Sequence, residues 1–308
     1  MMVSSSPLRP SLLLLAAVPV VLGARITPPP PEANPYTEAL LKTVRALAHS
    51  VPGELPTSIG CLSVQDDSSA LSDAVADAPH TKVYQVTPVF QIRYHAGWVM
   101  VDAAYTKEMA GNSGTFFPDR YEQIVAALRG ARLIVITHEH NDHVGTLTVP
   151  VVAKDVAPKT LLTKQQEQTM LYKPKLTGAK LDAAAARRFL IVDYPRVLPI
   201  APGVVLIRAD GHTPGSQMVY VKLASGREVV LVGDVVWHMT GIDEQRQKPD
   251  SASLQMREDR TTIDQQIRWL KTVVTPAGIT PVVSHDGTEI QSLVKQGILT
   301  DGLDVSAP

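Results

Sequence analysis

The feature that most constrains this chain is a cluster of metal-binding residue types directly after a short apolar run. Leu133–Ile136 reads Leu-Ile-Val-Ile, the pattern of a strand buried on both faces of a sheet. The next segment, Thr137–His143, contains four candidate ligands: His138, His140, Asp142 and His143. A chain that leaves a strand can turn sharply and point several side chains into one concave site. Imidazole and carboxylate suit zinc and similar ions, so this segment predicts a metal site at the end of a strand.

Strands and helices alternate in two successive blocks, which favours sheets covered by helices on the outside. A helix is expected after Asn34, and Ser50–Pro79 shows no clear element. The first block predicts strands over 83–86, 89–94, 98–101 and 133–136, with helices over 119–128, 164–171 and 182–189. The second block predicts strands over 204–207, 218–223, 228–232 and 281–283, with helices over 263–274 and 289–296.

Three further histidines or aspartates stand just after predicted strands. His212 lies in the turn-rich segment 211–216, Asp234 follows an apolar run that ends at Val232, and His285 follows Val283. Each of these residues alone would more often be an ordinary buried histidine or a turn aspartate. Their shared placement after strands indicates that they face the same site.

This set of motifs, H-x-H-x-D-H followed by the three later ligands in order, resembles the metallo-β-lactamase superfamily over roughly residues 83–290. The resemblance implies an α/β fold, an αββα sandwich of two β/α halves. It also implies two divalent metal ions per chain, expected to be zinc. By resemblance, one ion would be held by His138, His140 and His212, the other by Asp142, His143 and His285, with Asp234 between them.

The resemblance implies a metallohydrolase in which a hydroxide bound to both metals attacks a carbonyl group. Two cations lower the pKa of a shared water, and one of them stabilises the oxyanion that forms. Asp142 is the expected catalytic residue, because it can orient the nucleophile and pass a proton to the leaving group. Asp102 matches a position where the family commonly keeps a buried, supporting aspartate; the alternative is a plain aspartate at a strand end. Thr213 and Ser216 are expected to stabilise the loop around His212.

Asp234 favours the lactonase, glyoxalase-II-like and organophosphate-hydrolase branches, since true zinc β-lactamases lack a bridging aspartate there. The preferred substrate is a lactone or carboxylic ester, with β-lactams and phosphotriesters as alternatives. From another class, an iron-dependent oxidoreductase of the same fold stays open. Lactonases commonly carry a tyrosine three residues after the bridging aspartate, and this chain has Trp237.

The segment Val236–Arg260 is long for a connection between regular elements. We expect it to shape substrate choice through Trp237, His238 and Met239. Trp237 and Met239 would form an apolar wall for a hydrophobic acyl or aryl arm, and His238 could face the site. The alternative is a solvent-exposed surface loop with one short helix.

Residues 1–24 have the pattern of a secretory signal peptide. Arg9 precedes the apolar run Leu12–Leu22, and the small residues Gly23 and Ala24 follow it. The run is shorter than the ~20 residues of a spanning helix. An uncleaved N-terminal anchor is the alternative. We therefore expect a secreted or periplasmic protein without stable membrane insertion after cleavage. Residues 25–80 would form a Pro-rich spacer and helical extension, and residues 81–308 the catalytic domain.

The composition limits the partners and the kind of metal site. Lys+Arg 29 against Asp+Glu 30 gives a net charge of -1, which argues against a nucleic-acid partner and favours a small-molecule substrate. Cys61 is the single cysteine, so the chain can form neither an internal disulfide nor a thiolate metal site. Cys61 is expected to be a small buried apolar residue.

Overall fold

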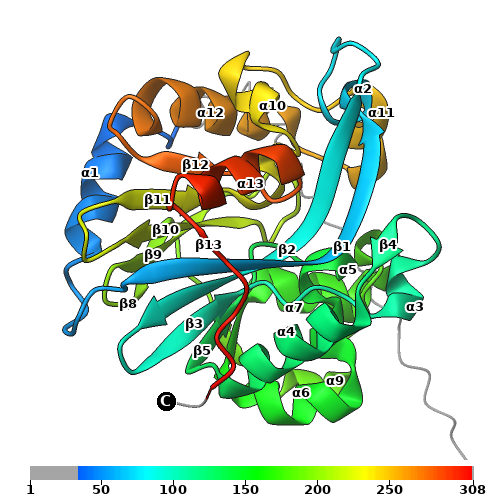
Figure 1. Ribbon diagram of the computed structural model, residues 1–308, viewed down its shortest axis with the longest axis vertical. Coiled ribbons are helices and arrows are strands. Elements are labelled where there is room, and N and C mark those ends of the chain that lie inside the picture. The colour runs from blue at the N-terminus through cyan, green and yellow to red at the C-terminus, as the bar shows by residue number, and fades with distance from the viewer. Residues whose placement is uncertain (1–33, 307–308) are drawn as a thin grey trace, which may run out of the picture. The chain divides into compact units, whose positions relative to one another are not determined.

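The protein consists of two β-sheets packed face to face, with helices on both outer sides (Figure 1). The structure is a computed structural model that describes residues 34–306. The expected signal peptide over residues 1–24 lies outside the described residues. Within the described part of the chain, no helix is both long and apolar enough to cross a bilayer.

The larger sheet contains eight strands among the described residues, in the order β13-β1-β2-β3-β5-β6-β7 with β4 paired to β1. These strands are β1 (Ser58–Ala70), β2 (Lys82–Tyr94), β3 (Gly97–Val101), β4 (Thr115–Phe116), β5 (Leu133–Val135), β6 (Thr160–Thr163), β7 (Leu190–Val192) and β13 (Thr300–Asp301). Strands β1, β2 and β3 are antiparallel neighbours, whereas β3, β5, β6 and β7 run parallel. The segments that follow β3 and β5 therefore leave the sheet at the same edge.

The smaller sheet has five strands in the described chain, in the order β12-β11-β10-β9-β8. They are β8 (Val197–Ala201), β9 (Val204–Arg208), β10 (Gln217–Lys222), β11 (Glu228–Leu231) and β12 (Thr280–Val282). β11 and β12 are parallel, so the segments that follow them also share one edge.

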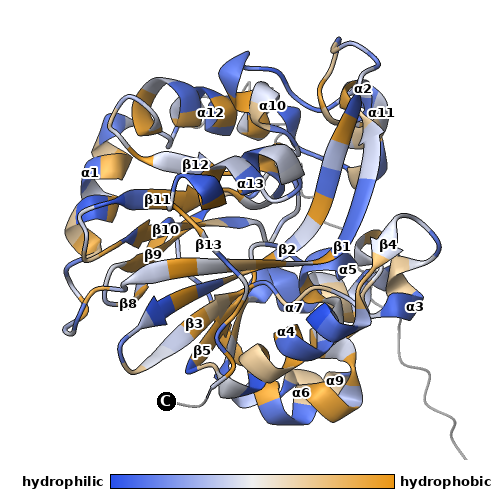
Figure 2. Ribbon diagram, in the orientation of Figure 1, coloured by the Kyte–Doolittle hydropathy of each residue, from blue (hydrophilic) through white to orange (hydrophobic). Residues whose placement is uncertain are grey.

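Helices cover the outer face of each sheet, and their apolar sides close the core. The longer helices are α1 (Glu38–Leu47), α4 (Pro118–Gly130), α7 (Lys164–Tyr172), α12 (Arg260–Trp269) and α13 (Gly287–Lys295). The shorter ones are α2 (Leu71–Ala74), α3 (Lys107–Ala110), α5 (Asn141–Val144), α6 (Pro150–Val156), α8 (Pro174–Thr177), α9 (Ala183–Ala186), α10 (Met239–Asp243) and α11 (Asp250–Met256). Figure 2 shows apolar strands inside and helices of mixed polarity outside.

Alternate residues of the same strand serve different apolar layers, as the two-residue period of a strand requires. On β3, Met100 packs under the helices outside the larger sheet, whereas Val101 lies between the two sheets. On β9, Leu206 lies between the sheets and Ile207 packs against the helices outside the smaller one. The expected αββα sandwich is therefore confirmed.

The structure differs from expectation before residue 80. Strand β1 lies where Ser50–Pro79 showed no clear element, and it pairs with β2 over most of its length. Residues from Pro35 onward form one compact unit, so the described part of the expected extension, residues 35–80, contributes α1 and strand β1 to the sandwich. The outer half of β1 carries polar side chains, from Gln65 to Ser69, and this polarity hides the strand in the sequence.

Cys61 provides a test of this arrangement. It lies on β1 between the sheets, only 4% exposed, and burial raises the pKa of its thiol to about 12. Because the thiolate is the reactive form, we expect no labelling of the folded protein by Ellman's reagent at pH 8. Urea-unfolded protein should release one equivalent of thionitrobenzoate per chain. Fast stoichiometric labelling of the folded protein would contradict the placement of β1.

Candidate metal centre

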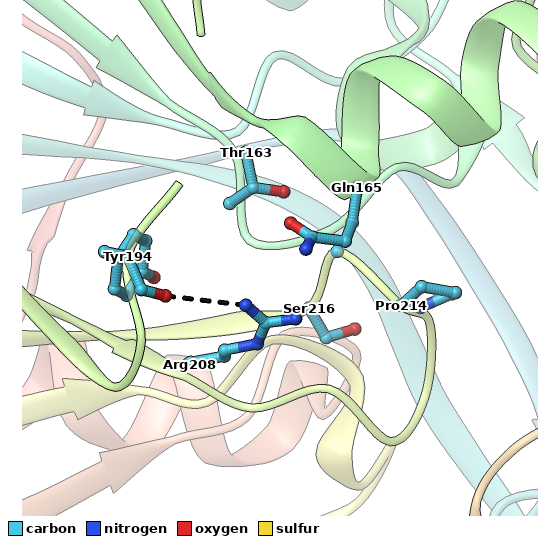
Figure 3. Close-up of a pocket in the computed structure, with 7 residues that line it drawn as sticks. Thr163, Gln165, Tyr194, Arg208, Pro214 and Ser216 are labelled. Atoms are coloured by element: carbon cyan, nitrogen blue, oxygen red, sulfur yellow. Dashed lines mark hydrogen bonds between the residues drawn. The ribbon is translucent and has the colours of Figure 1, made fainter. Parts of the chain in front are cut away.

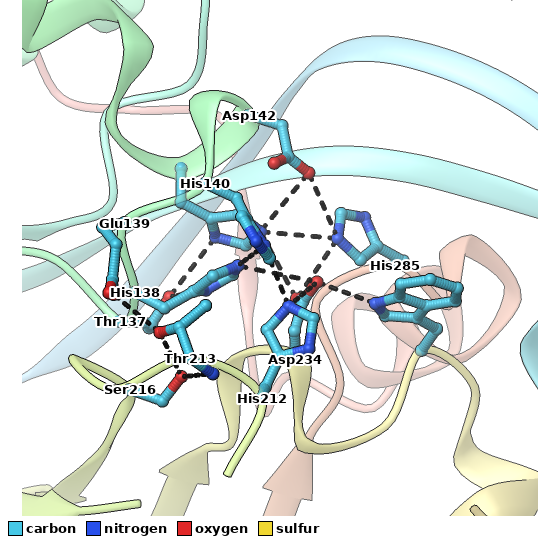
Figure 4. Close-up of polar contacts among 12 residues, drawn as sticks. Thr137, His138, Glu139, His140, Asp142, His212, Thr213, Ser216, Asp234 and His285 are labelled. Carbon is cyan, nitrogen blue, oxygen red and sulfur yellow. Dashed lines mark hydrogen bonds and ion pairs between the residues drawn. The ribbon is translucent and has the colours of Figure 1, made fainter. Parts of the chain in front are cut away.

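Four segments that each follow a strand meet at one edge of the sandwich (Figure 4). The segment after β5 contains His138, His140, Asp142 and His143, and the turn after β9 contains His212. Asp234 follows β11 and His285 follows β12. The fold thus brings together all seven of the residues expected at the metals, most of them with buried side chains.

One group of three imidazoles converges on a single point. His140 Nδ1 lies 3.1 Å from His138 Nε2 and 2.9 Å from His212 Nε2. Tetrahedral zinc with bonds of about 2.0–2.1 Å would hold its nitrogen ligands roughly 3.3 Å apart. The spacing of these three nitrogens therefore fits a shared cation.

A second group lies beside the first. His143 Nε2 is 3.4 Å from His285 Nε2, and Asp142 Oδ2 is 3.5 Å from each of these nitrogens. The side chain of Asp142 is 28% exposed, so it belongs to the group and still faces the outside. These three residues fit a second cation position.

Asp234 lies between the two groups and divides its oxygens between them. Its Oδ1 is 3.3 Å from His143 Nε2 and 3.2 Å from His285 Nε2, while its Oδ2 faces His138 and His212 at 3.8 and 3.6 Å. The buried Oδ1 has no hydrogen-bond partner among the described residues, which is costly unless a cation binds it.

The electrostatics of the two groups differ. Burial lowers the pKa of His140 to about 3, and burial with His143 nearby lowers the pKa of His138 well below its usual value. Burial alone would also lower the pKa of His143, but Asp142, Asp234 and Asp102 outweigh it and raise that pKa well above the usual value. The imidazoles of the first group are neutral, as metal ligands must be, and the carboxylates that favour a proton on His143 would equally favour a cation in its place.

The sequence profile of the metallo-beta-lactamase superfamily matches residues 86–255, more than half of the 308 residues. The chain belongs to the metallo-beta-lactamase superfamily. No curated protein matches it.

Solved structures of the superfamily share the fold at low sequence identity. An N-acyl homoserine lactone hydrolase with N-hexanoyl-L-homoserine at its catalytic metal centre has a TM-score of 0.60 and 13% identity, covering 77% of this chain and 96% of its own. A probable metal-dependent hydrolase from Staphylococcus aureus has a TM-score of 0.57 and 12% identity, covering 76% and 91%. A dizinc quorum-quenching lactonase has a TM-score of 0.51 and 13% identity, covering 73% and 86%.

Asp102 supports the second group. Of the two roles considered from the sequence, it has that of a buried, supporting aspartate rather than that of a plain aspartate at a strand end. It is fully buried, and its Oδ2 accepts a hydrogen bond of 2.8 Å from His143 Nδ1. Its Oδ1 accepts one of 2.7 Å from the backbone N–H of Thr137. The backbone of Asp102 has a φ of 66°, a conformation that aspartate and asparagine tolerate better than most residues. This carboxylate therefore fixes both the ring of His143 and the start of the ligand segment.

A buried ion pair that the sequence did not reveal supports the first group. His212 Nδ1 donates to Glu258 Oε1 at 2.5 Å, and the ammonium of Lys248 donates to the same oxygen at 2.6 Å. Lys248 is 0% exposed, and it also donates to the backbone carbonyls of Asp234 and Val235. In the sequence, Lys248 and Glu258 look like solvated charges in a polar stretch, so nothing marked them as buried.

Glu139 is a second residue that sequence reasoning missed, although it stands between two ligand histidines. Its buried carboxylate accepts hydrogen bonds from the hydroxyl of Thr213 at 2.6 Å and from the backbone N–H of Gly215 at 3.2 Å. A Cβ at Gly215 would lie 2.6 Å from Glu139 Oε2, so only glycine fits there. Thr213 and Ser216 bond to each other at 2.8 Å, consistent with the loop-stabilising role expected for them.

The three residues expected at the substrate have different surroundings. The indole N–H of Trp237 donates to Asp234 Oδ2 at 2.7 Å, so it supports the metal centre although its ring lines the adjacent cavity. His238 Nε2 lies 3.4 Å from Asp286 Oδ2, and Met239 packs against the core outside the smaller sheet. Trp237 lines the cavity, whereas His238 and Met239 are not among its lining residues.

Two cavities adjoin the ligand segments. One, of about 300 Å³, is lined by Asp142, His285 and Trp237 together with residues of β1 and β2. The other, behind the loop that carries Pro214 and Ser216, measures only about 10 Å³ and is also lined by Tyr194 and Arg208 (Figure 3). The small cavity has room for about one water molecule, so the larger one is the candidate substrate site.

The contact of Asp102 with His143 predicts a loss of metal affinity in Asp102→Asn. Asparagine tolerates the backbone conformation and can still accept from Thr137, but it loses the charge beside His143. We expect affinity for the second metal to fall about 10- to 100-fold, measured by competition with a chromogenic chelator. The exposed substitution Asp119→Asn should leave both affinities unchanged, and equal affinities in all three proteins would contradict the role of Asp102.

The Lys248–Glu258 pair predicts that removing Lys248 alone destabilises the protein more than removing both charges. Lys248→Met leaves a buried carboxylate without its cation and should lower the free energy of unfolding by about 3–5 kcal/mol. The double variant Lys248→Met/Glu258→Gln should lose less, because no unpaired charge remains. Urea unfolding at equal metal load measures both. A single variant within about 1 kcal/mol of wild type would show that the pair is not buried as described.

Proposed function

We propose that this chain is a dinuclear metal-dependent hydrolase of lactones or carboxylic esters, with zinc as its metal. The observation that carries the proposal is Asp234, whose two oxygens face two separate groups of ligands. Two solved structures with the same fold are lactone hydrolases, one described with its product at the catalytic metal centre and the other as a dizinc enzyme. Their chemistry supports the proposal by analogy of fold.

In this proposal, His138, His140 and His212 would hold one cation, and Asp142, His143 and His285 the other, with Asp234 shared. The pair of cations would supply Lewis acidity and lower the pKa of water at the site. Asp142 is the candidate catalytic residue, because its Oδ2 faces His143 and His285 while the side chain also lines the large cavity. From that position it would orient the attacking water and carry a proton to the leaving group on Oδ1.

The phenol of Tyr105 is a candidate donor to the substrate. Tyr105 lines the same cavity as Asp142, and its hydroxyl lies 3.5 Å from Thr87 Oγ1. Burial raises the pKa of Tyr105, so its hydroxyl keeps its proton at neutral pH. Because Trp237 already donates to Asp234, Tyr105 would take the place of the tyrosine that is missing after the bridging aspartate.

We also propose that the protein acts outside the cytoplasm, in the periplasm or the medium. The support is the charged start, short apolar run and small-residue exit of residues 1–24. A histidine ligand set is compatible with this location, since it has no thiolate that could be oxidised.

The proposed metal centre predicts about two transition-metal ions per chain. Dialysis against a chelator should abolish hydrolysis, and zinc, manganese or cobalt should restore it. Asp142→Asn should keep the melting temperature within a few degrees yet lower kcat about 10²- to 10⁴-fold, since it removes the proton carrier. Elemental analysis and a panel of lactones, aryl esters, a phosphotriester and a chromogenic β-lactam provide the measurements.

Several outcomes would contradict the proposal. Active protein without a transition metal would exclude the metal centre, and tightly bound iron without hydrolysis of any panel member would favour the oxidoreductase alternative. Cleavage of only the β-lactam or only the phosphotriester would keep the metal centre and replace the substrate class.

A further inference from the structure

One face of a two-stranded hairpin forms a wall of the large cavity, beside the segment that carries the ligand His285. Gln65, Asp67 and Ser69 alternate along β1, and Gln85 and Thr87 alternate along β2. Asp67 and Gln85 are direct partners in the register of the two strands. Side chains two residues apart share a face of a strand, so these polar groups form a continuous wall.

The cavity carries negative charge. Asp67 and Asp73 both line it, and Val86 is the sole aliphatic residue among the described residues that do so. Neither lysine nor arginine lines it within the described chain. The basic groups nearby are engaged elsewhere: Arg120 pairs with Asp66, and Lys107 lies over the ring of Phe116. Trp237 and Tyr105 supply apolar surface, so acidic charge is what distinguishes this cavity.

The side-chain amide of Gln65 independently indicates that the cavity binds a group with a hydrogen-bond donor. Its side chain is only 3% exposed, and its Nε2 donates to the backbone carbonyl of Ser113 at 2.9 Å. That bond fixes the orientation of the amide, yet the buried Oε1 has no hydrogen-bond partner among the described residues. A buried acceptor without a donor is unfavourable, and a ligand N–H in the cavity would satisfy it.

We infer that this cavity selects esters or lactones whose far end carries an ammonium or a similar cationic N–H group. The inference rests on the proposed function, because it places the carbonyl at the metal ligands. The far end would then meet Asp67, Asp73 and the amide oxygen of Gln65. A volume of about 300 Å³ suits a compact substrate.

Three aryl esters of equal chain length test the inference on the zinc-loaded protein. The p-nitrophenyl esters of 6-aminohexanoate, heptanoate and monopimelate share the same methylene chain and differ only in an ammonium, a methyl or a carboxylate at the far end. We expect kcat/KM to fall in that order, with the ammonium ester about tenfold above the neutral one, mainly through KM. Equal kcat/KM for the ammonium and neutral esters would overturn the inference.

Variants assign the effect to the cavity. Asp67→Asn/Asp73→Asn keeps the oxygens that accept from Ser68 and Ala70 but removes both charges. It should bring the ammonium and neutral esters to within about twofold of each other, mainly by lowering kcat/KM for the ammonium ester. The control Asp119→Asn/Glu122→Gln removes two exposed charges on α4, outside the cavity lining, and should keep the tenfold preference. The same result from both double variants would show that net charge, not the cavity, sets the preference.

Equilibrium binding separates failure of this inference from failure of the proposed function. If none of the esters is hydrolysed, the proposed reaction is wrong, and calorimetry with 6-aminohexanoate and heptanoate still tests the cavity. About tenfold tighter binding of 6-aminohexanoate, lost in Asp67→Asn/Asp73→Asn, would support the inference. Equal affinity for the two acids would overturn it.

Discussion

The metal centre depends on one carboxylate that two sets of imidazoles share. Asp234 is buried, it contacts four histidines within 3.8 Å, and one of its oxygens lacks any hydrogen bond in the described chain. The backbone that carries it is fixed from both sides. Gly233 adopts a left-handed conformation with a φ of 56°, and Lys248 binds the carbonyl that follows. Both sheets are needed to bring these groups together, because the ligands come from loops at the same edge of each.

The surroundings of the ligands are as well defined as the ligands themselves. His143 donates to Asp102, His212 donates to Glu258, and His285 donates to the backbone carbonyl of Val86. Each of these bonds fixes which ring nitrogen is free to face a cation. The burial of the two carboxylates is compensated in different ways. Asp102 accepts hydrogen bonds from Thr137, whereas Glu258 has a buried lysine as its partner. Asp102 directly follows an apolar strand, whereas Lys248 and Glu258 stand in irregular segments of a polar stretch.

This difference explains what could be predicted from the sequence. Ligands that follow apolar strands carry a local signal, and so does the alternation of strands and helices that gives the sandwich. Asp102 has the same signal, because it also ends a strand. Lys248 and Glu258 have none, since burial of a charge in an irregular segment is decided by residues far away in the chain. The bond from the indole N–H of Trp237 to Asp234 likewise has no signal in the sequence. The outer half of β1 was missed because it projects from the core and is polar.

The hairpin of β1 and β2 therefore has two parts with unequal tolerance to mutation. Near Ile59 and Ile92 it is part of the packed interior, where a change of even one methylene group is felt. Near Asp67 and Gln85 it contributes little to the core, so exchanges there should cost the fold little. Reactivity and selectivity thus reside on different elements. Divergence of such a chain toward new compounds would proceed by drift along the outer half of the hairpin, without rebuilding the loops that bind the cations.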